Sequence, residues 1–291
     1  MPGPAYGQPA DVTLAPGLYV VSTPIGNLRD ITLRAIDTLA AADEVLSEDT
    51  RVAGKLMSAY ELKPKLSPYH DHNGAERRPG LLKKLKNNGV IALISDAGTP
   101  LVSDPGWKLV HEALEAGINV FPVPGASAML AGLVASGLPS DKFMFAGFLP
   151  SKSTARKNFC DSLKAVPSTL IFYESGPRLA ATLADLSETL GGNRSAAVAR
   201  ELTKLFEETR RGTLAELANH YSEKGPPKGE IVLLIGPPED QVFTQETIDA
   251  ALREALADHP MKAAANAVAE AMNLSKRDIY QRALKLKSDG L

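Results

Sequence analysis

Short apolar runs recur along this chain, each ending in small, turn-forming residues, with amphipathic stretches between them. None of these runs alternates strictly between polar and apolar residues, which is typical of parallel strands covered on both faces. The alternation of strand and helix predicts a parallel sheet with helices on its faces. In the first half we expect strands at 18–22, 44–47, 90–95 and 119–123, and helices at 31–42, 75–87, 107–116 and 126–136.

A second set of strands begins where the helical pattern stops, near residues 138–142. It ends at Pro237 and Pro238, because prolines cannot continue a helix or a central strand, and the chain after them reads as helical. A length of 291 residues suffices for two domains with cores of their own. The second strands are expected at 143–148, 169–173, 196–199 and 230–235, with helices at 177–190 and 214–221. The expected domains are a flexible arm at 1–16, α/β domains at 17–138 and 142–238, and a helical, helix-turn-helix-like tail at 242–291.

The composition excludes several classes of protein. Cys160 is the single cysteine, so neither an internal disulfide framework nor a multi-cysteine metal site is expected. The apolar runs are far shorter than the roughly 20 residues of a membrane span, and the first residues lack the pattern of a secretory signal. We therefore expect a cytoplasmic protein without membrane contact. The net charge of −2 argues against a protein that coats a polyanion, but it allows a local basic patch.

Loops rich in small residues follow the expected strands at 22–27, 95–106 and 122–128. Ligands bind beyond the carboxyl ends of the strands in open parallel sheets. Each loop alone could be an ordinary capped turn, but together they favour a nucleotide-like ligand. The loops match no Gly-rich phosphate-binding motif. They contain no basic residue, and only Arg29 lies close to them in sequence, so a neutral or cationic ligand suits them better than a triphosphate does. Asp96 could pair with an ammonium group, and nearby main-chain groups could bond an adenine or a carboxylate.

Charged residues follow the second expected strand, where Glu48, Asp49 and Arg51 stand together. One carboxylate could act as a general base with Arg51 on a phosphate, or the segment could simply begin a helix with an acidic cap. His70 and His72 lack evident third and fourth metal ligands, so no metal is expected there. The segment 125–129 departs from a nucleophile elbow at its last position, Met129, which disfavours a hydrolase.

Taken in order, five segments resemble the ribosomal RNA small subunit methyltransferase I family, which belongs to the tetrapyrrole methylase fold group of class III methyltransferases. The likeness covers residues 17–236, and the tail resembles the extra C-terminal domain of that family. The N-terminal arm departs from the family pattern. The matching segments are 21–28, 48–51, 95–106, 124–127 and 200–204.

The resemblance implies two α/β domains with S-adenosylmethionine between them, and a homodimer. It also implies 2′-O-methylation of a cytidine ribose in the decoding region of 16S rRNA within the 30S subunit. The residues that the resemblance places on the cofactor are Pro24, Ser95, Asp96, Ala97, Gly98, Thr99, Ser127, Ala128, Tyr173, Glu174 and Leu202.

Methyl transfer from a sulfonium requires neither a metal nor a covalent nucleophile, but a ribose hydroxyl is a weak acid and calls for a proton acceptor. We expect Glu48 or Asp49 in that role, beside Arg51. The residues expected to contact RNA are Arg200, Lys204, His70 and His72. Two alternatives stay open: methylation of a small molecule such as a tetrapyrrole, which would not require the basic helical tail, and a nucleic-acid-binding regulator that senses a ligand.

Overall fold

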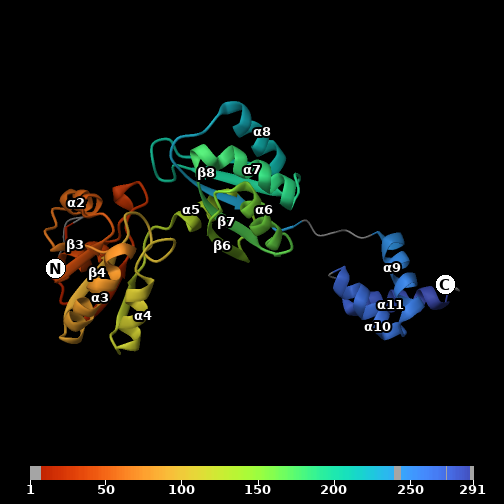
Figure 1. Cartoon of the computed structure of the whole chain (residues 1–291), viewed down its shortest axis with the longest axis horizontal. Coiled ribbons are helices and arrows are strands. Elements are labelled where there is room, and N and C mark those ends of the chain that lie inside the picture. Colours follow the sequence, from red (N-terminus) through yellow and green to blue (C-terminus); the bar gives the residue numbers. More distant parts are fainter. Residues whose placement is uncertain (1–7, 239–243, 273, 289–291) are drawn as a thin grey trace. The chain divides into compact units, whose positions relative to one another are not determined.

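The computed structural model describes residues 8–238, 244–272 and 274–288. The chain forms two compact units, Met1–Pro238 and Glu239–Leu291, which we describe separately (Figure 1). Residues 1–7 of the expected arm lie outside the described residues. The next part of the arm is held by contacts, because the amide of Ala10 donates to Asp37 at 2.7 Å and Leu14 packs against the first core.

The first sheet is entirely parallel, as predicted, with the strand order β3-β2-β4-β1-β5. Its third strand was not predicted, because it is only three residues long. The strands are β1 (Gly17–Val21), β2 (Glu44–Ser47), β3 (Leu66–Pro68), β4 (Val90–Ile94) and β5 (Val120–Val123).

Helices cover both faces of this sheet. Val45 of β2 packs in one core with α1 and α2, whereas its neighbour Leu46 packs in another with α3 and α4, because successive strand residues point to opposite faces. No residue range was predicted for helix α2, but its start at an acidic cap, Asp49, was one of the two interpretations of the charged segment. The elements are the 3₁₀ turn η1 (Leu28–Asp30) and α1 (Leu33–Ala41), α2 (Thr50–Ala59), α3 (Asp71–Lys86) and α4 (Trp107–Glu115).

The second sheet is mixed, with the order β6-β7-β10-β8-β9. Only β6 and β7 run parallel, and the other neighbours are antiparallel. The edge strand β9 escaped prediction because its sequence, Glu-Thr-Arg-Arg-Gly-Thr, is polar throughout. The strands are β6 (Phe143–Phe148), β7 (Thr169–Ser175), β8 (Ser195–Arg200), β9 (Glu208–Thr213) and β10 (Glu230–Ile235).

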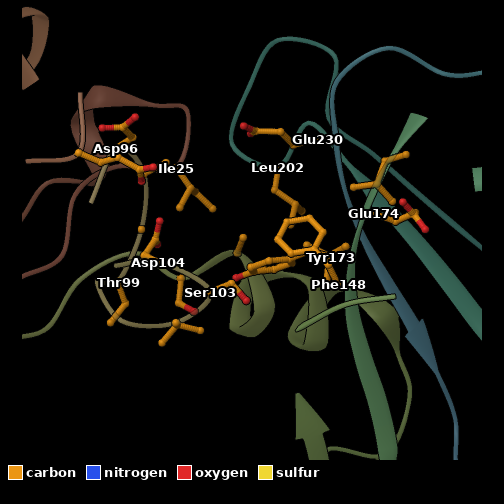
Figure 2. A pocket seen from close by; sticks show the side chains of 18 residues that line it. Ile25, Asp96, Thr99, Ser103, Asp104, Phe148, Tyr173, Glu174, Leu202 and Glu230 are labelled. Carbon is orange, nitrogen blue, oxygen red and sulfur yellow. The ribbon is translucent and has the colours of Figure 1, made fainter. Parts of the chain in front are cut away.

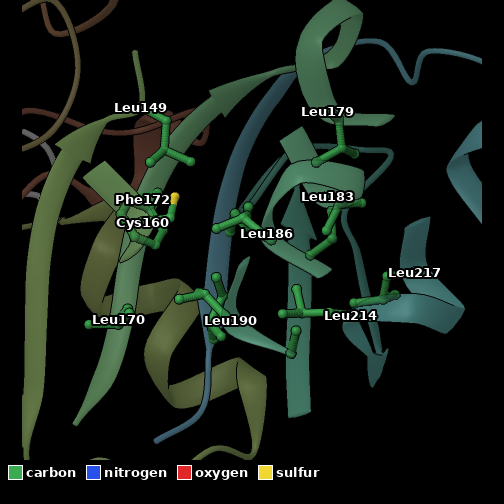
Figure 3. Close-up of a cluster of buried hydrophobic side chains, with 14 of the residues drawn as sticks. Leu149, Cys160, Leu170, Phe172, Leu179, Leu183, Leu186, Leu190, Leu214 and Leu217 are labelled. Carbon is green, nitrogen blue, oxygen red and sulfur yellow. The ribbon is translucent and has the colours of Figure 1, made fainter. Parts of the chain in front are cut away.

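One face of the second sheet is covered by α6 (Ser153–Ser162), α7 (Gly176–Leu190) and α8 (Leu214–Lys224). Figure 3 shows the core between them, in which Phe172 of the sheet lies beside the buried Cys160, and Leu183 of α7 belongs to the same cluster.

The opposite face is covered by α5 (Ala128–Ser136), whose Leu133 packs with Ile171 and Val232. The boundary expected at 138–142 therefore separates the strands of the two sheets, but α5, placed before it, packs on the second sheet. Ile25, in the loop after β1, belongs to the same cluster and so joins the two sheets.

The tail consists of α9 (Gln245–Asp258), α10 (Met261–Ala271) and α11 (Lys276–Ser288), packed around Leu252, Val268 and Ile279. This confirms the helical tail. On α10, Ala265 and Ala269 are buried, whereas Ala267 and Ala271 are exposed. In an alanine-rich helix no large side chain marks the buried face. Within the described residues, no helix is long and apolar enough to cross a membrane.

Candidate active site

The loops that follow β1, β4 and β5 are joined by hydrogen bonds into one unit. Thr23 and Gly98 exchange backbone hydrogen bonds of 2.9 and 3.1 Å, and the buried hydroxyl of Ser95 donates to the carbonyl of Gly98 at 3.0 Å. Thr99 donates to the carbonyl of Ala126 at 3.3 Å. Gly98 has a φ of +80°, which side-chain-bearing residues rarely adopt. These bonds hold main-chain groups in a fixed cradle.

A cavity of about 360 Å³, here called the inner cavity, opens beside this cradle between the two sheets (Figure 2). Its volume falls in the usual range for small-ligand sites. Most of the residues that were expected to bind the cofactor line this cavity, but Pro24 and Ser95 do not. Ser95 instead stabilises the cradle through its hydrogen bond to Gly98. The lining residues are Ile25, Glu48, Asp96, Ala97, Gly98, Thr99, Val102, Ser103, Asp104, Ser127, Ala128, Phe148, Tyr173, Glu174, Leu202, Glu230, Ile231 and Val232.

The inner cavity is acidic. Glu48, Asp96 and Asp104 line it, and among the described residues no lysine or arginine does. Burial, together with the negative charges of Glu48 and Asp96, raises the pKa of Asp104 to about 6. Asp104 was not predicted as a site residue, although it lies in the same loop motif, eight positions after the predicted Asp96. The lining favours a cationic ligand.

Tyr173 and Glu174, at the end of β7, contribute differently to the wall that the second sheet gives to the inner cavity. The Tyr173 ring packs edge-on against Phe145 and Phe148, with centroid separations of 4.8 and 5.6 Å, and burial raises the pKa of its hydroxyl. The Glu174 carboxylate accepts hydrogen bonds from the amide of Ser175 at 2.8 Å and the hydroxyl of Thr182 at 2.7 Å. In Figure 2 Glu174 lies on the far side of Tyr173 from Asp104. Its carboxylate therefore secures the start of α7.

A second, more open cavity of about 480 Å³, here called the outer cavity, adjoins the inner one and shares Glu48 and Asp96 with it. It brings together the residues expected in catalysis and the two histidines expected to contact RNA. These side chains come from the carboxyl ends of β2, β3 and β4. The outer cavity is lined by Glu48, Asp49, Thr50, Arg51, Pro68, His70, His72 and Asp96.

The two carboxylates expected as general base have different surroundings. Asp49 caps α2 and accepts hydrogen bonds from the Arg51 amide at 2.8 Å and the Arg51 guanidinium at 2.6 Å. These bonds lower the pKa of Asp49 to about 2. Among the described residues, none forms a hydrogen bond or ion pair with the carboxylate of Glu48. Asp49 is thus occupied as a helix cap, while Glu48 faces both cavities.

The basic residues expected on RNA are divided between two places. His70 and His72 stand together in the outer cavity, with ring centroids 5.9 Å apart, and the buried Nδ1 of His70 has no hydrogen-bond partner among the described residues. Arg200 and Lys204 line neither cavity. Arg200 pairs with Glu208 at 3.2 Å, and Lys204 pairs with Glu201 and Glu230 at 2.9 Å each.

Comparisons with solved structures agree on the fold. A cobalt precorrin-4 methyltransferase superposes with a TM-score of 0.56 at 17% identity, covering 81% of this chain and 97% of that one. A uroporphyrin-III C-methyltransferase from Thermus thermophilus, solved in complex with S-adenyl homocysteine, gives 0.52 at 22% identity, covering 76% and 97%.

Comparisons of sequence define the family. Residues 17–218 match the model for tetrapyrrole (corrin/porphyrin) methylases, and residues 244–287 match the RsmI C-terminal HTH domain. Proteins named ribosomal RNA small subunit methyltransferase I are similar to this chain, with 53% identity in Mesorhizobium japonicum over 94% of this chain and 93% of that protein. The protein of that name from Erythrobacter litoralis is 51% identical over 94% and 97%. The chain therefore belongs to the ribosomal RNA small subunit methyltransferase I family, within the tetrapyrrole methylases.

Proposed function

We propose that this chain, an S-adenosylmethionine-dependent ribosomal RNA methyltransferase, methylates the ribose 2′-hydroxyl of a cytidine in the decoding region of 16S rRNA. The observation that carries the proposal is the wall shared by the two cavities, at which Glu48 faces both. A methyl donor on one side and a ribose on the other would meet beside a carboxylate that has no partner among the described residues.

The inner cavity fits S-adenosylmethionine. The cofactor is a cation at its sulfonium, which suits a lining with Asp96 and Asp104 and without lysine or arginine among the described residues. Its adenine and amino-acid ends require hydrogen-bonding groups, which the backbone around Gly98 and Ser127 supplies. We assign the binding role to Asp96, Gly98, Thr99, Ser127 and Tyr173. When bound, the cofactor supplies an electrophilic methyl group.

The outer cavity suits a nucleotide. Arg51 has a side chain that is 87% exposed and can reach a phosphate, while His70 and His72 offer ring faces and nitrogen atoms to a base or a sugar. We assign Glu48 as the group that accepts the proton of the 2′-hydroxyl as the oxygen attacks. Asp49 suits that role less, because its low pKa makes it a poor proton acceptor and Arg51 occupies it.

We also propose that the protein acts in the cytoplasm as a homodimer on the assembled 30S subunit. Exposed apolar side chains on the edge strand β6 and on α5, including Phe143, Met144 and Val134, support the dimer. Light scattering should give twice the chain mass, and Val134→Glu together with Met144→Glu should reduce it. A monomeric wild-type protein would refute the proposed dimer but would not contradict the proposed methylation of the ribose.

The reaction is tested by incubating the protein with undermethylated 30S subunits, naked 16S rRNA and a tetrapyrrole, each with labelled S-adenosylmethionine. We expect label on the 30S subunit, mapped to one cytidine ribose. Label on a base, or on the tetrapyrrole alone, would refute the proposal and in the second case favour the small-molecule alternative. A duplex DNA shift without any methyl transfer would favour the regulator.

A further inference from the structure

The loop between β8 and β9 presents two apolar side chains to solvent. Leu205 is 89% exposed and Phe206 is 68% exposed, although the fold buries most of its other large apolar residues. A mobile loop could carry such residues without consequence, so the rigidity of this loop decides whether they matter.

Hydrogen bonds fix the loop on both sides of its tip. Lys204 pairs with Glu201 and Glu230 at 2.9 Å each, and the amide of Thr203 donates to the Glu207 carboxylate at 2.6 Å. Across to the first sheet, the amide of Asn27 donates to the Thr203 hydroxyl at 3.1 Å. The tip, Leu205 and Phe206, is therefore flanked by hydrogen-bonded residues on both sides, which we call the frame: Glu201, Thr203, Lys204 and Glu207.

The frame also holds strained backbone. Glu201 and Thr203 have φ values of +51° and +66°, and the left-handed region is costly for a β-branched residue such as threonine. Strain of roughly 1–3 kcal/mol per residue persists only where the surroundings enforce it, and it gathers at binding and active sites. Both residues lie within five positions of the exposed pair.

The tip is continuous with the candidate active site. Leu202, three residues before Leu205, lines the inner cavity together with Glu230, the partner of Lys204 (Figure 2). Asn27, which holds Thr203, lies in the loop after β1 that carries Ile25 of the same cavity. A macromolecule that enters the cavities would thus meet the tip of this loop.

We propose that Phe206 stacks on a base next to the target nucleotide when rRNA binds. The inference rests on the proposed function. A nucleotide that enters the outer cavity would move away from a neighbour in its strand, and the neighbouring base would lose a stacking contact that an aromatic ring can replace. Because hydrogen bonds already hold this loop, little backbone freedom is lost when RNA binds. Phe206 is in this sense a positioning residue.

The test compares Phe206→Ala with Phe206→Trp on undermethylated 30S subunits. Base–aromatic stacking contributes about 1–3 kcal/mol, so Phe206→Ala should lower kcat/KM for methyl transfer by about 5- to 150-fold. Phe206→Trp should stay within threefold of the wild type, because it keeps a stacking face. The affinity for S-adenosylmethionine, the melting temperature and the oligomeric state should not change. Leu114→Ala is the control, since Leu114 is 58% exposed on α4 and belongs to neither cavity.

Three results would overturn the inference. Phe206→Ala with activity within twofold of the wild type would show that the ring is not used. Loss of activity together with a changed oligomeric state would assign the tip to a second copy of the chain. Equal loss of cofactor affinity would show that the loop only supports the inner cavity. A wild-type protein that fails to methylate an rRNA ribose would instead refute the proposed function.

Discussion

The two cavities share one wall, yet they are built in different ways. The inner cavity lies between the sheets and takes residues from both, with acidic and apolar walls. The outer cavity takes its lining from the first sheet alone and adds Arg51, His70 and His72. The less open inner cavity, with its acidic walls, suits a small cation. The more open outer cavity combines an arginine and two histidine rings with three carboxylates, and it has room for part of a nucleotide. Under the proposed function, the cofactor and the RNA would be recognised by two sets of residues that have Glu48 and Asp96 in common.

Replacing the shared carboxylate should have the largest effect. Glu48→Gln keeps the shape of the side chain but removes the proton acceptor, so we expect single-turnover methyl transfer to fall by about 10²- to 10⁴-fold. The affinity for S-adenosylmethionine, measured by calorimetry, should change little, because the other acidic residues remain.

Asp49→Asn is the matched control for this change. It should reduce the rate less than Glu48→Gln does, and asparagine can still cap α2. If Glu48→Gln retained full single-turnover activity, the assignment of the shared wall to catalysis would be wrong.

The next effect should be confined to the inner cavity. At Gly98 the φ of +80° is costly for alanine, and an added Cβ would lie 3.3 Å from Cγ2 of Ile25. The cofactor-free variant should relieve a penalty of about 1–2 kcal/mol by moving this loop out of its binding conformation. Binding must restore that conformation, so cofactor affinity should weaken by about 5- to 30-fold. Gly117→Ala is the control, since Gly117 has a φ of +71° but no atom within 4 Å of its added Cβ. Equal losses of affinity in both variants would show that the effect comes from general destabilisation.

The same contrast explains what sequence reasoning could reach. The parallel first sheet was predicted because most residues of its longer strands are apolar and these strands end in recognisable loops. The strands β3 and β9 escaped, since one is very short and the other is polar. The path of the loop after β4 was also hidden, because its turns depend on Leu101 and Ser103 adopting positive φ, which their residue types do not announce. The sequence therefore did not reveal that Asp104 lines the inner cavity. It also did not reveal that the Glu174 carboxylate accepts a hydrogen bond from Thr182 of α7.

A smaller effect is expected in the outer cavity. Replacing both His70 and His72 by alanine should raise KM for the 30S subunit by about tenfold, a loss of about 1.4 kcal/mol of binding. Cofactor affinity should stay unchanged, because neither histidine lines the inner cavity. Measuring KM and cofactor affinity on the same preparation separates the two cavities. A variant that loses cofactor affinity while KM holds would reverse their assignment.

A further effect, of similar size, concerns the protonation of Asp104. Its pKa in the folded chain is about 6, against 3.8 for the ordinary group. Between those values the unfolded chain releases this proton while the folded chain keeps it, so this residue makes the fold less stable as pH rises from about 4 to 6. Asp104→Asn mimics the protonated acid. Its stability relative to the wild type should rise over that interval by about 1–2 kcal/mol, allowing for solvent screening, and stay level above it.

Urea unfolding of the cofactor-free proteins at pH 4.5, 6 and 7.5 measures this difference in stability. A cation in the inner cavity should favour the ionised form of Asp104, so wild-type affinity for S-adenosylmethionine should increase from pH 5 to 7. The neutral product S-adenosylhomocysteine should show little of this increase, and Asp104→Asn should lose much of it for the cofactor. If the cofactor and the product had the same pH dependence in the wild type, the acidic wall would not act on the sulfonium charge. Any preference of the inner cavity for S-adenosylmethionine over S-adenosylhomocysteine would then have to come from the shape of the cavity.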